Sequence, residues 1–486
     1  MWEDLNAEIE SADPRDLRIA ELERENAELK AMVAKLLLHV QVLEAKQAQN
    51  SGNSSRPPST DPPGAAPPAK PPRKSGRRRG GQPGHKKHER TRLPPERVTA
   101  TTSLFPAECR RCDMPLTGTD PAPYVHQVVD IPPVLAEGHD YLLHSLLCTK
   151  CKVYTRAELP SGVPTGNFGP RLQAMVGVAS GRYHMSKRLI EEMMSDFFAV
   201  EVSLGSISNL EQETSEALAV PVAEAAQYVK AQPIKHADET GWTEAKQRAW
   251  LWVVVTANVA VFLIRRSRGA AVAKELLGEV FTGILNSDRW SGYNWVPTSM
   301  RQLCWAHLFR QFKGFEDHGV HGKRIGLALQ ACTETMFSHW HRVRDGTLQR
   351  STFQQYMRPI RSEVLDLLRQ GSLCGVQKVT GRCREILKLE GALFTFVRMT
   401  GVEPTNNVAE RTVRPAVLWR KGSFGTDSEN GSRFVERILT VVATLRIQKR
   451  NVLDFVTAAC EARLRGQAAP SLLPPTVPLE LRAIAA

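Results

Sequence analysis

Hydrophobic side chains near the N-terminus recur every seven residues. Leucine fills one position of this repeat and mostly β-branched residues fill the other; the eight positions are Ile19, Asn26, Val33, Val40, Leu22, Leu29, Leu36 and Leu43. These residue types favour a parallel two-stranded coiled coil, in which a buried Asn26 fixes the register. We therefore predict a leucine zipper in residues 1–49 and a homodimer. The alternative is a single helix packed on its own domain, although the Pro-rich stretch that follows isolates it.

Residues 50–98 are rich in Pro, Gly and Ser, which predicts a disordered linker. Ten Lys or Arg residues lie between positions 70 and 92, against the single acid Glu89. This density indicates an arm that contacts phosphate groups, and a solvated tether is the alternative. The candidate DNA contacts in this arm are Arg77, Arg78, Arg79, Lys86 and Lys87.

The pattern of residues 166–230 is helical. Segments Ser186–Phe198 and Ser206–Leu218 flank a short turn that contains Gly205. The arrangement is typical of a helix-turn-helix, whose second helix reads DNA, but two helices that only pack together look the same. We interpret the segment as a helical DNA-binding region, with plain packing as the alternative.

Strand periodicity begins at residue 231. Apolar runs predict three strands, a helix and a fourth strand, at Ile234–Thr240, Trp250–Thr256, Val259–Arg265, Gly269–Phe281 and Gly283–Asp288. This order is that of a ribonuclease-H-like α/β core, in which the first and fourth strands lie side by side. The core would comprise residues 231–325 and 401–460, separated by an α-helical insertion at 326–400 and followed by a C-terminal tail at 461–486.

The composition indicates a multidomain α+β protein with an anionic partner. The chain has 486 residues, enough for about three domains plus connectors. Its formal net charge of +13 favours nucleic acid as that partner. Because we find no export signal and no run of about 18 apolar residues, we expect a cytoplasmic protein without a membrane partner. Nine cysteines in such a protein favour reduced thiols and metal ligands over disulfides.

Two CxxC pairs, thirty-five residues apart, lie in residues 99–165. Their members are Cys109, Cys112, Cys148 and Cys151. Two such pairs complete a closed tetrahedral site, so we predict a zinc ribbon with one structural Zn²⁺; a chance spacing is the alternative. Its strands are predicted at Val125–Ile131 and Tyr141–Leu147.

Two aspartates lie at the ends of predicted core strands. Asp238 follows the first strand's apolar run, and Asp288 ends the fourth, so the predicted fold makes them neighbours. Adjacent carboxylates repel one another unless cations lie between them, and open oxygen sites suit Mg²⁺ or Mn²⁺. Two such ions can activate a nucleophile and stabilise the leaving oxygen of a phosphoryl transfer. Alternatively, each aspartate caps the segment that follows it.

Glu410 is the predicted third ligand of the two catalytic metal ions. It lies in a predicted helix that Thr405 or Asn406 would cap. Arg411 and Arg414 flank it and would contact DNA phosphates. The alternative is a surface ion pair between Glu410 and Arg414, which is worth about 0.3–0.5 kcal/mol.

Cys304 and His307 have the spacing of zinc ligands, but no second pair lies near them in the sequence. We therefore expect no zinc at this position. Instead, His307 and Arg310 are predicted to contact DNA beside the active site. A histidine buried in the core is the alternative.

Taken in their order along the chain, these motifs resemble those of the transposases of the insertion-sequence-66 family of bacterial mobile elements. The resemblance extends over nearly the whole chain. Besides the zipper and the CxxC pairs, the resemblance rests on Ser54–Asp61, Gly80–His85, Asp238–Thr240, Asp288, Cys304–His307 and Asn406–Arg411. It implies that Asp238, Asp288 and Glu410 occupy the family's DDE positions. It also implies binding to terminal inverted repeats, DNA strand cleavage and transfer to target DNA, with accessory proteins of the element as potential partners. A non-catalytic repressor of the same DNA ends and a structure-specific nuclease are the alternatives.

Overall fold

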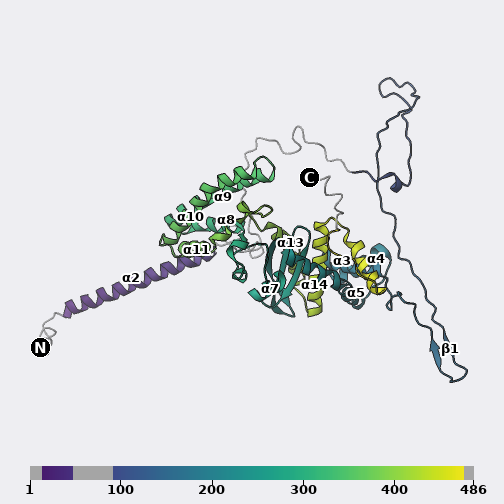
Figure 1. The fold of residues 1–486 in the computed structure, drawn as a ribbon, viewed down its shortest axis with the longest axis horizontal. Helices are drawn as coiled ribbons and strands as arrows, with labels where there is room; N and C mark the ends of the chain where they lie inside the picture. The colour runs from purple at the N-terminus through teal and green to yellow at the C-terminus, as the bar shows by residue number, and fades with distance from the viewer. Residues whose placement is uncertain (1–13, 48–90, 476–486) are drawn as a thin grey trace.

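The computed structural model describes residues 14–47 and 91–475. Helix α2 (Pro14–Gln47) confirms the expected N-terminal helix and projects away from the rest of the chain (Figure 1). Leu29 and Leu36 of its heptad are each 60% exposed, so the described part of this chain does not cover the apolar stripe. Pairing of two such helices stays a prediction. The five candidate DNA contacts of the basic arm, Arg77, Arg78, Arg79, Lys86 and Lys87, lie outside the described residues.

Residues 91–165 form long extended loops. One short hairpin lies at the tip of one of these loops, where Figure 1 labels its first strand β1. The hairpin pairs β1 (Ser145–Leu147) with β2 (Tyr154–Arg156) in antiparallel register. One 3-10 turn at Pro95–Arg97 precedes it. These loops leave large apolar side chains such as Leu104 (89% exposed) in solvent.

Two strand predictions in this region need correction. Val125–Ile131 is not a strand, and Tyr141–Leu147 is a strand only over its last three residues. A strand requires a hydrogen-bonded neighbour, which an alternating apolar pattern cannot supply by itself. The partner of β1 lies beyond the second CxxC pair rather than between the two pairs.

A mixed five-stranded sheet forms the centre of the molecule, with the strand order β5-β4-β3-β6-β7. The strands are β3 (Ile234–Glu244), β4 (Gln247–Val255), β5 (Ala260–Arg265), β6 (Ile284–Ser287) and β7 (Arg301–Leu303). β3, β4 and β5 form an antiparallel meander, whereas β6 runs parallel to β3 and β7 parallel to β6. The predicted adjacency of the first and fourth core strands is therefore confirmed.

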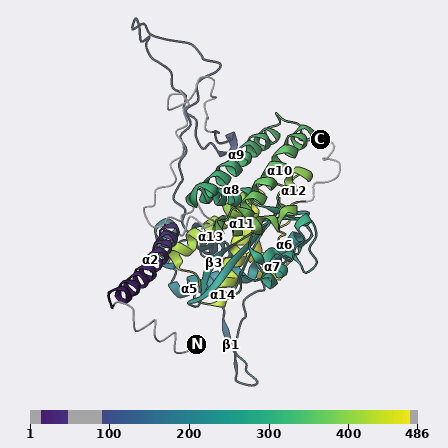
Figure 2. The same cartoon turned by 90° about the vertical axis from the view of Figure 1, so that its left-hand side faces the viewer.

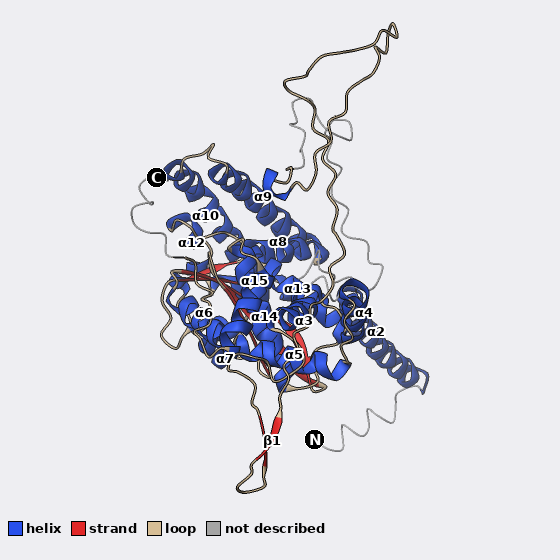
Figure 3. Ribbon diagram, turned by 90° about the vertical axis from the view of Figure 1, so that its right-hand side faces the viewer, coloured by secondary structure: helices blue, strands red, loops and turns tan. Residues whose placement is uncertain are grey.

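Helices pack on both faces of this sheet (Figure 3). Those before the sheet are α3 (Pro170–Tyr183), α4 (Lys187–Phe198), α5 (Leu204–Ala217) and α6 (Ala219–Ala231). Those within or after it are α7 (Ala270–Leu277), α13 (Asn407–Ser423), α14 (Glu429–Ile447) and α15 (Val452–Leu464). The two predicted helices are present as α4 and α5, but Gly205 lies in the first turn of α5 rather than in the turn between them, because Ser203 caps the helix.

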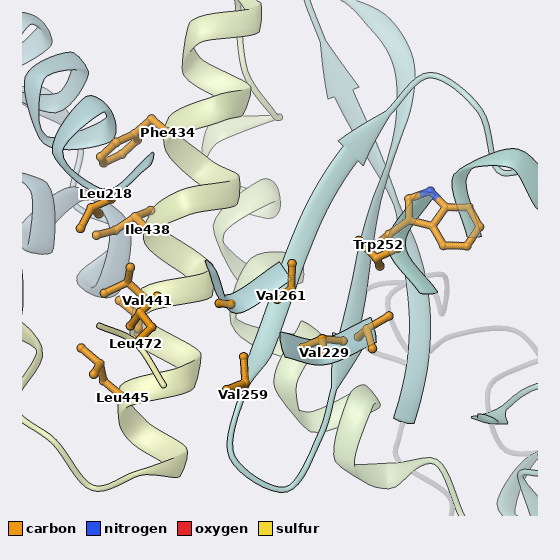
Figure 4. Close-up of a cluster of buried hydrophobic side chains, with 14 of the residues drawn as sticks. Leu218, Val229, Trp252, Val259, Val261, Phe434, Ile438, Val441, Leu445 and Leu472 are labelled. Carbon is orange, nitrogen blue, oxygen red and sulfur yellow. The ribbon is translucent and has the colours of Figure 1, made fainter. Parts of the chain in front are cut away.

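The residues of β4 alternate between two hydrophobic cores. Leu251 and Val253 pack in the cluster that includes Val413 of α13, whereas Trp252 and Val254 pack in the cluster that includes α14. Figure 4 shows the second cluster, in which β5 residues lie beside α14. Both faces of the sheet are thus buried, which explains the continuous apolar run that predicted this strand.

Helix α14 also covers the outer edge of β5. Thr440 and Thr444 accept hydrogen bonds from the Phe262 and Ala260 amides, at 3.0 and 3.1 Å. Side chains of a helix here replace the missing neighbour strand, so this edge of the sheet cannot pair with another chain.

A helical insertion separates β7 from α13. Its helices are α8 (Trp305–Gly314), α9 (Gly319–Arg344), α10 (Arg350–Leu373), α11 (Gln377–Leu387) and α12 (Thr395–Arg398), and α9 and α10 lie side by side in Figure 2. These helices begin at Trp305, before the predicted start of the insertion at residue 326. A turn around Gly391, which packs against Thr298 too closely for a side chain, separates α11 from α12. No helix in the described ranges has the length and apolar character needed to cross a bilayer.

Candidate active site

The sheet register places the two aspartates next to each other. His236 of β3 pairs with Asn286 of the parallel strand β6. Asp238 and Asp288 each lie two residues beyond this pair, in the same direction along adjacent strands. Strands in a sheet lie about 4.8 Å apart, so the backbone segments that carry the two acids lie side by side at the carboxyl end of β6.

A loop that precedes α13 is hydrogen-bonded to this same part of the sheet. Asn286 donates from its amide nitrogen to the Glu403 and Thr405 carbonyl oxygens, at 2.7 and 3.1 Å. The backbone amide of Trp305, at the start of α8, donates to the Pro404 carbonyl at 2.9 Å. The loop is therefore held by both β6 and α8, although Glu403 lies 117 residues after Asn286 and Pro404 lies 99 residues after Trp305.

Asn406 connects this loop to β3. Its amide nitrogen donates to the Ala237 carbonyl at 2.7 Å, and its oxygen lies 3.2 Å from His236 Nδ1. Asn406 stands at the N-cap position of α13, but its side chain does not cap the helix, so the capping prediction is wrong. The competing partners on β3 explain this, because a buried amide bonded to a strand cannot also reach the helix amides. One turn later α13 carries Glu410 to the site.

The three acids share one electrostatic environment. Burial raises the pKa of Asp238 well above its ordinary value, and the charges of Glu239, Asp288 and Glu410 raise it further. Carboxylates that destabilise one another in this way offer hard oxygen ligands, which suit Mg²⁺ or Mn²⁺. The residues present therefore fit divalent metal ions.

Two of the three acids also have a local contact. Asp288 Oδ1 accepts a hydrogen bond from the Trp290 amide at 2.8 Å, which is the capping contact considered as its alternative role. Glu410 Oε1 lies 3.4 Å from His307 Nδ1 and 3.8 Å from Cys304 Sγ. No ion pair between Glu410 and Arg414 occurs in the described residues.

Ligand atoms of Cys304, His307 and Glu410 lie within 4.8 Å of one another, and within the described ranges this is the one group of three or more that does so. The oxygens of Asp238, Asp288 and Glu410 do not gather as tightly. The structure thus brings the three acids into one region but joins Glu410 most closely to the start of α8.

The predicted DNA contacts differ in exposure. Arg411 and Arg414 lie exposed on α13, within one turn of Glu410. His307 and Arg310 are half-buried on α8, and burial, followed by the nearby charge of Arg310, lowers the pKa of His307. Burial of His307 also agrees with the alternative of a core histidine, but its contact with Glu410 places it at the site.

A comparison with protein families matches residues 165–433, more than half of the chain, to the family described as "Transposase IS66 family". The chain belongs to this family. Residues 10–91 match a second one, described as "Family of unknown function (DUF6444)". In this IS66-family protein, all three acids and the Cys304–His307 motif fall within the matched range, whereas both CxxC pairs fall outside it.

A curated relative from Sinorhizobium fredii, "Uncharacterized protein y4qI", is 25% identical over 240 residues. The aligned region covers 43% of this chain and 43% of the relative. The chain therefore spans less than half the length of the relative it matches. That relative's printed name states no activity.

Sequence reasoning missed a buried acid beside the site of this IS66-family protein. Glu239 accepts hydrogen bonds from the Tyr293 hydroxyl at 2.6 Å and from Arg268 at 2.7 Å. Burial, followed by the charge of Asp288, raises the pKa of Glu239 to about 7. Arg268 stacks on Trp290, with its guanidinium carbon 3.7 Å from the ring centroid. The signal in the sequence is the pair of adjacent acids Asp238 and Glu239, of which only Asp238 was predicted to be a metal ligand.

Each CxxC pair forms a tight turn of the same construction. The Cys109 amide donates to Met114, and the Cys148 amide donates to Val153, both at 2.9 Å. Backbone hydrogen bonds, chiefly from Arg111 and Cys151 respectively, lower the pKa of the Cys109 and Cys148 thiols. In the described residues the sulfurs of the two turns do not gather in one group. The two turns thus share one local geometry but lie apart, and a common zinc site stays a prediction.

Proposed function

We propose that the protein is a DDE-type DNA transposase. It would bind the terminal inverted repeats of its mobile element and catalyse strand cleavage and strand transfer through Asp238, Asp288 and Glu410. The parallel pairing of β3 with β6 carries this proposal, because it makes neighbours of two acids 50 residues apart. The strand order β5-β4-β3-β6-β7, with an antiparallel meander and two parallel strands, supports a ribonuclease-H-like core.

Two Mg²⁺ or Mn²⁺ ions, when bound by these acids, would activate the attacking oxygen and stabilise the leaving oxygen of the phosphoryl transfer. Other residues of the chain would position these acids. Asn286 and Asn406 hold the start of α13 against the sheet, so that Glu410, which belongs to no strand, would reach the two aspartates from the helix. Arg411 and Arg414 lie exposed beside Glu410, where their charges would hold the DNA backbone.

The remaining DNA contacts would come from several elements. His307 and Arg310 of α8 would touch the strand near the scissile phosphate. Helix α5, as the second helix of the α4–α5 pair, would read the element ends, and the basic arm between residues 70 and 92 would add phosphate contacts. Several weak, separate contacts of this kind make binding strongly dependent on salt concentration.

A strand-transfer assay distinguishes this function from its alternatives. Purified protein is mixed with Mn²⁺, pre-cut element ends that carry a free 3′ hydroxyl and a supercoiled target plasmid. A transposase joins the ends to the plasmid, a structure-specific nuclease cuts without joining, and a repressor only binds. Failure to join, with binding intact, would contradict the proposal.

The two CxxC turns would come together on one structural Zn²⁺. Tetrahedral zinc needs four ligands, and each turn supplies two thiols, of which backbone hydrogen bonds favour the first, Cys109 or Cys148, as a thiolate. The double variant Cys109→Ser/Cys112→Ser should lose about one zinc per chain by metal analysis of the purified full-length protein. Unchanged zinc content would contradict this assignment.

The exposed stripe on α2 would form a homodimeric coiled coil. Leu29→Asp places a charge in the predicted seam, whereas Ala31→Asp places the same charge on the outer face of the same turn. We expect the first variant to be monomeric and the second to remain dimeric, as measured by sedimentation equilibrium. A wild-type monomer, or equal behaviour of the two variants, would exclude the zipper.

A further inference from the structure

Three potential metal ligands meet at the N-terminus of α8. Cys304 precedes the helix, His307 lies in its first turn, and Glu410 reaches them from α13. Cys304 is 1% exposed, and the His307 and Glu410 side chains are 19% and 30% exposed. The group is therefore enclosed on the protein side and open to solvent only at the carboxylate and imidazole.

The distances within this group match those of tetrahedral zinc. Zinc bonds of about 2.0–2.3 Å separate two of its ligand atoms by roughly 3.4–3.6 Å. His307 Nδ1 lies 3.4 Å and Cys304 Sγ lies 3.8 Å from Glu410 Oε1. Both distances to Glu410 thus lie close to the spacing that a bound zinc ion would impose, and the histidine and cysteine ligand atoms lie within 4.8 Å of each other.

An unpaired donor atom provides independent support. His307 Nδ1 is buried and makes no hydrogen bond within the described residues, and it faces the Glu410 carboxylate. A buried nitrogen without a hydrogen-bond partner is unfavourable. A metal ion between the imidazole and the carboxylate would supply the missing partner.

The surroundings of Cys304 act on the thiol in two directions. The Asn406 amide donates to Cys304 Sγ at 3.1 Å, and the thiol lies at the N-terminus of α8, where the helix dipole favours negative charge. Burial, followed by the charge of Glu410, raises the pKa of the thiol to about 12, so the sulfur would become a thiolate only with a cation beside it. Thiolate and imidazole ligands select Zn²⁺ over Mg²⁺. One thiolate and one carboxylate also neutralise the ion's charge, so the nearby Arg310 does not oppose binding.

We propose that Cys304, His307 and Glu410 bind Zn²⁺, and that zinc bound there inhibits the enzyme by withholding Glu410 from the two aspartates. The inhibitory part rests on the proposed function, since it requires Glu410 to act in strand transfer. The binding part does not, because it concerns only the three ligands.

Metal analysis of full-length protein, dialysed against a small excess of Zn²⁺, tests the binding. In the Cys109→Ser/Cys112→Ser background we expect about one zinc per chain to remain. Adding Cys304→Ser or His307→Gln should remove it, whereas Cys332→Ala, at a buried cysteine of α9, should not. Circular dichroism verifies the fold of each variant, and His307→Gln decides the matter if Cys304→Ser does not fold. Equal zinc content in all folded variants would overturn the site.

The strand-transfer assay tests the inhibition. Zinc should reduce wild-type joining at saturating Mn²⁺, and a zinc-selective chelator should restore it. Zinc binding without such inhibition would overturn the inhibitory part. Wild-type protein that binds zinc at this site but never joins strands would instead contradict the proposed function and leave the zinc site standing.

Discussion

Asp288→Asn should abolish strand cleavage and strand transfer while leaving binding to the element ends unchanged. We expect joining to fall by at least about 10³-fold, the scale on which the loss of a preorganised charged group acts. The substitution removes the charge that would bind a metal ion. It retains the oxygen that accepts the Trp290 amide, so the local fold should persist.

Asp366→Asn is the matched control for this variant. Asp366 lies exposed on α10 and pairs only with Arg369, an interaction that contributes little to stability. Joining of pre-cut ends in the presence of Mn²⁺, together with a gel-shift measurement of end binding, separates chemistry from recognition. Wild-type joining by Asp288→Asn would remove Asp288 from the catalytic set.

The second large effect is expected at Asn406, which touches no substrate. Asn406→Ala leaves the buried Ala237 carbonyl and His236 Nδ1 without their partner, which should lower the free energy of unfolding by about 1–3 kcal/mol. Because the start of α13 would lose this attachment to β3, while Arg420 still holds the far end of the helix, Glu410 should shift. A displacement of about 1 Å reduces the rate on the order of 10²-fold.

A control of similar stability loss isolates the positional effect. Asn451 caps α15 by accepting hydrogen bonds from the Leu453 and Asp454 amides, and removing such a cap lowers stability by about 0.5–2 kcal/mol. Asn451→Ala should therefore lower the melting temperature but leave joining intact. If the two variants lose activity equally, Asn406 contributes only to stability.

The two proposals make opposite demands on Glu410. Strand transfer requires it near Asp238 and Asp288, whereas zinc binding requires it near Cys304 and His307. Electrostatic coupling to Asp238 and direct contact with His307 are both present in the structure. The proposed inhibition therefore requires the Glu410 side chain, in the first turn of α13, to move between the two sets of ligands.

Local patterns in the sequence determined the elements. The heptad predicted α2, the apolar runs predicted β3 to β6, and their order predicted that β3 and β6 are neighbours. Each of these inferences uses side chains a few residues apart, whose spacing alone selects a helix or a strand. The adjacency of Asp238 and Asp288 follows from the same order.

Contacts between distant segments were decided only by the tertiary structure. The partner of β1, the attachment of Asn406 to β3 and the meeting of Cys304 with Glu410 join residues whose spacing in sequence carries no sign of the contact. No second pair of ligands near Cys304 and His307 indicated a zinc site, because the candidate third ligand, Glu410, lies 106 residues from Cys304 in sequence. Spacing predicts ligands only within one turn or hairpin, whereas folding brings ligands together from separate elements whose packing depends on the whole core.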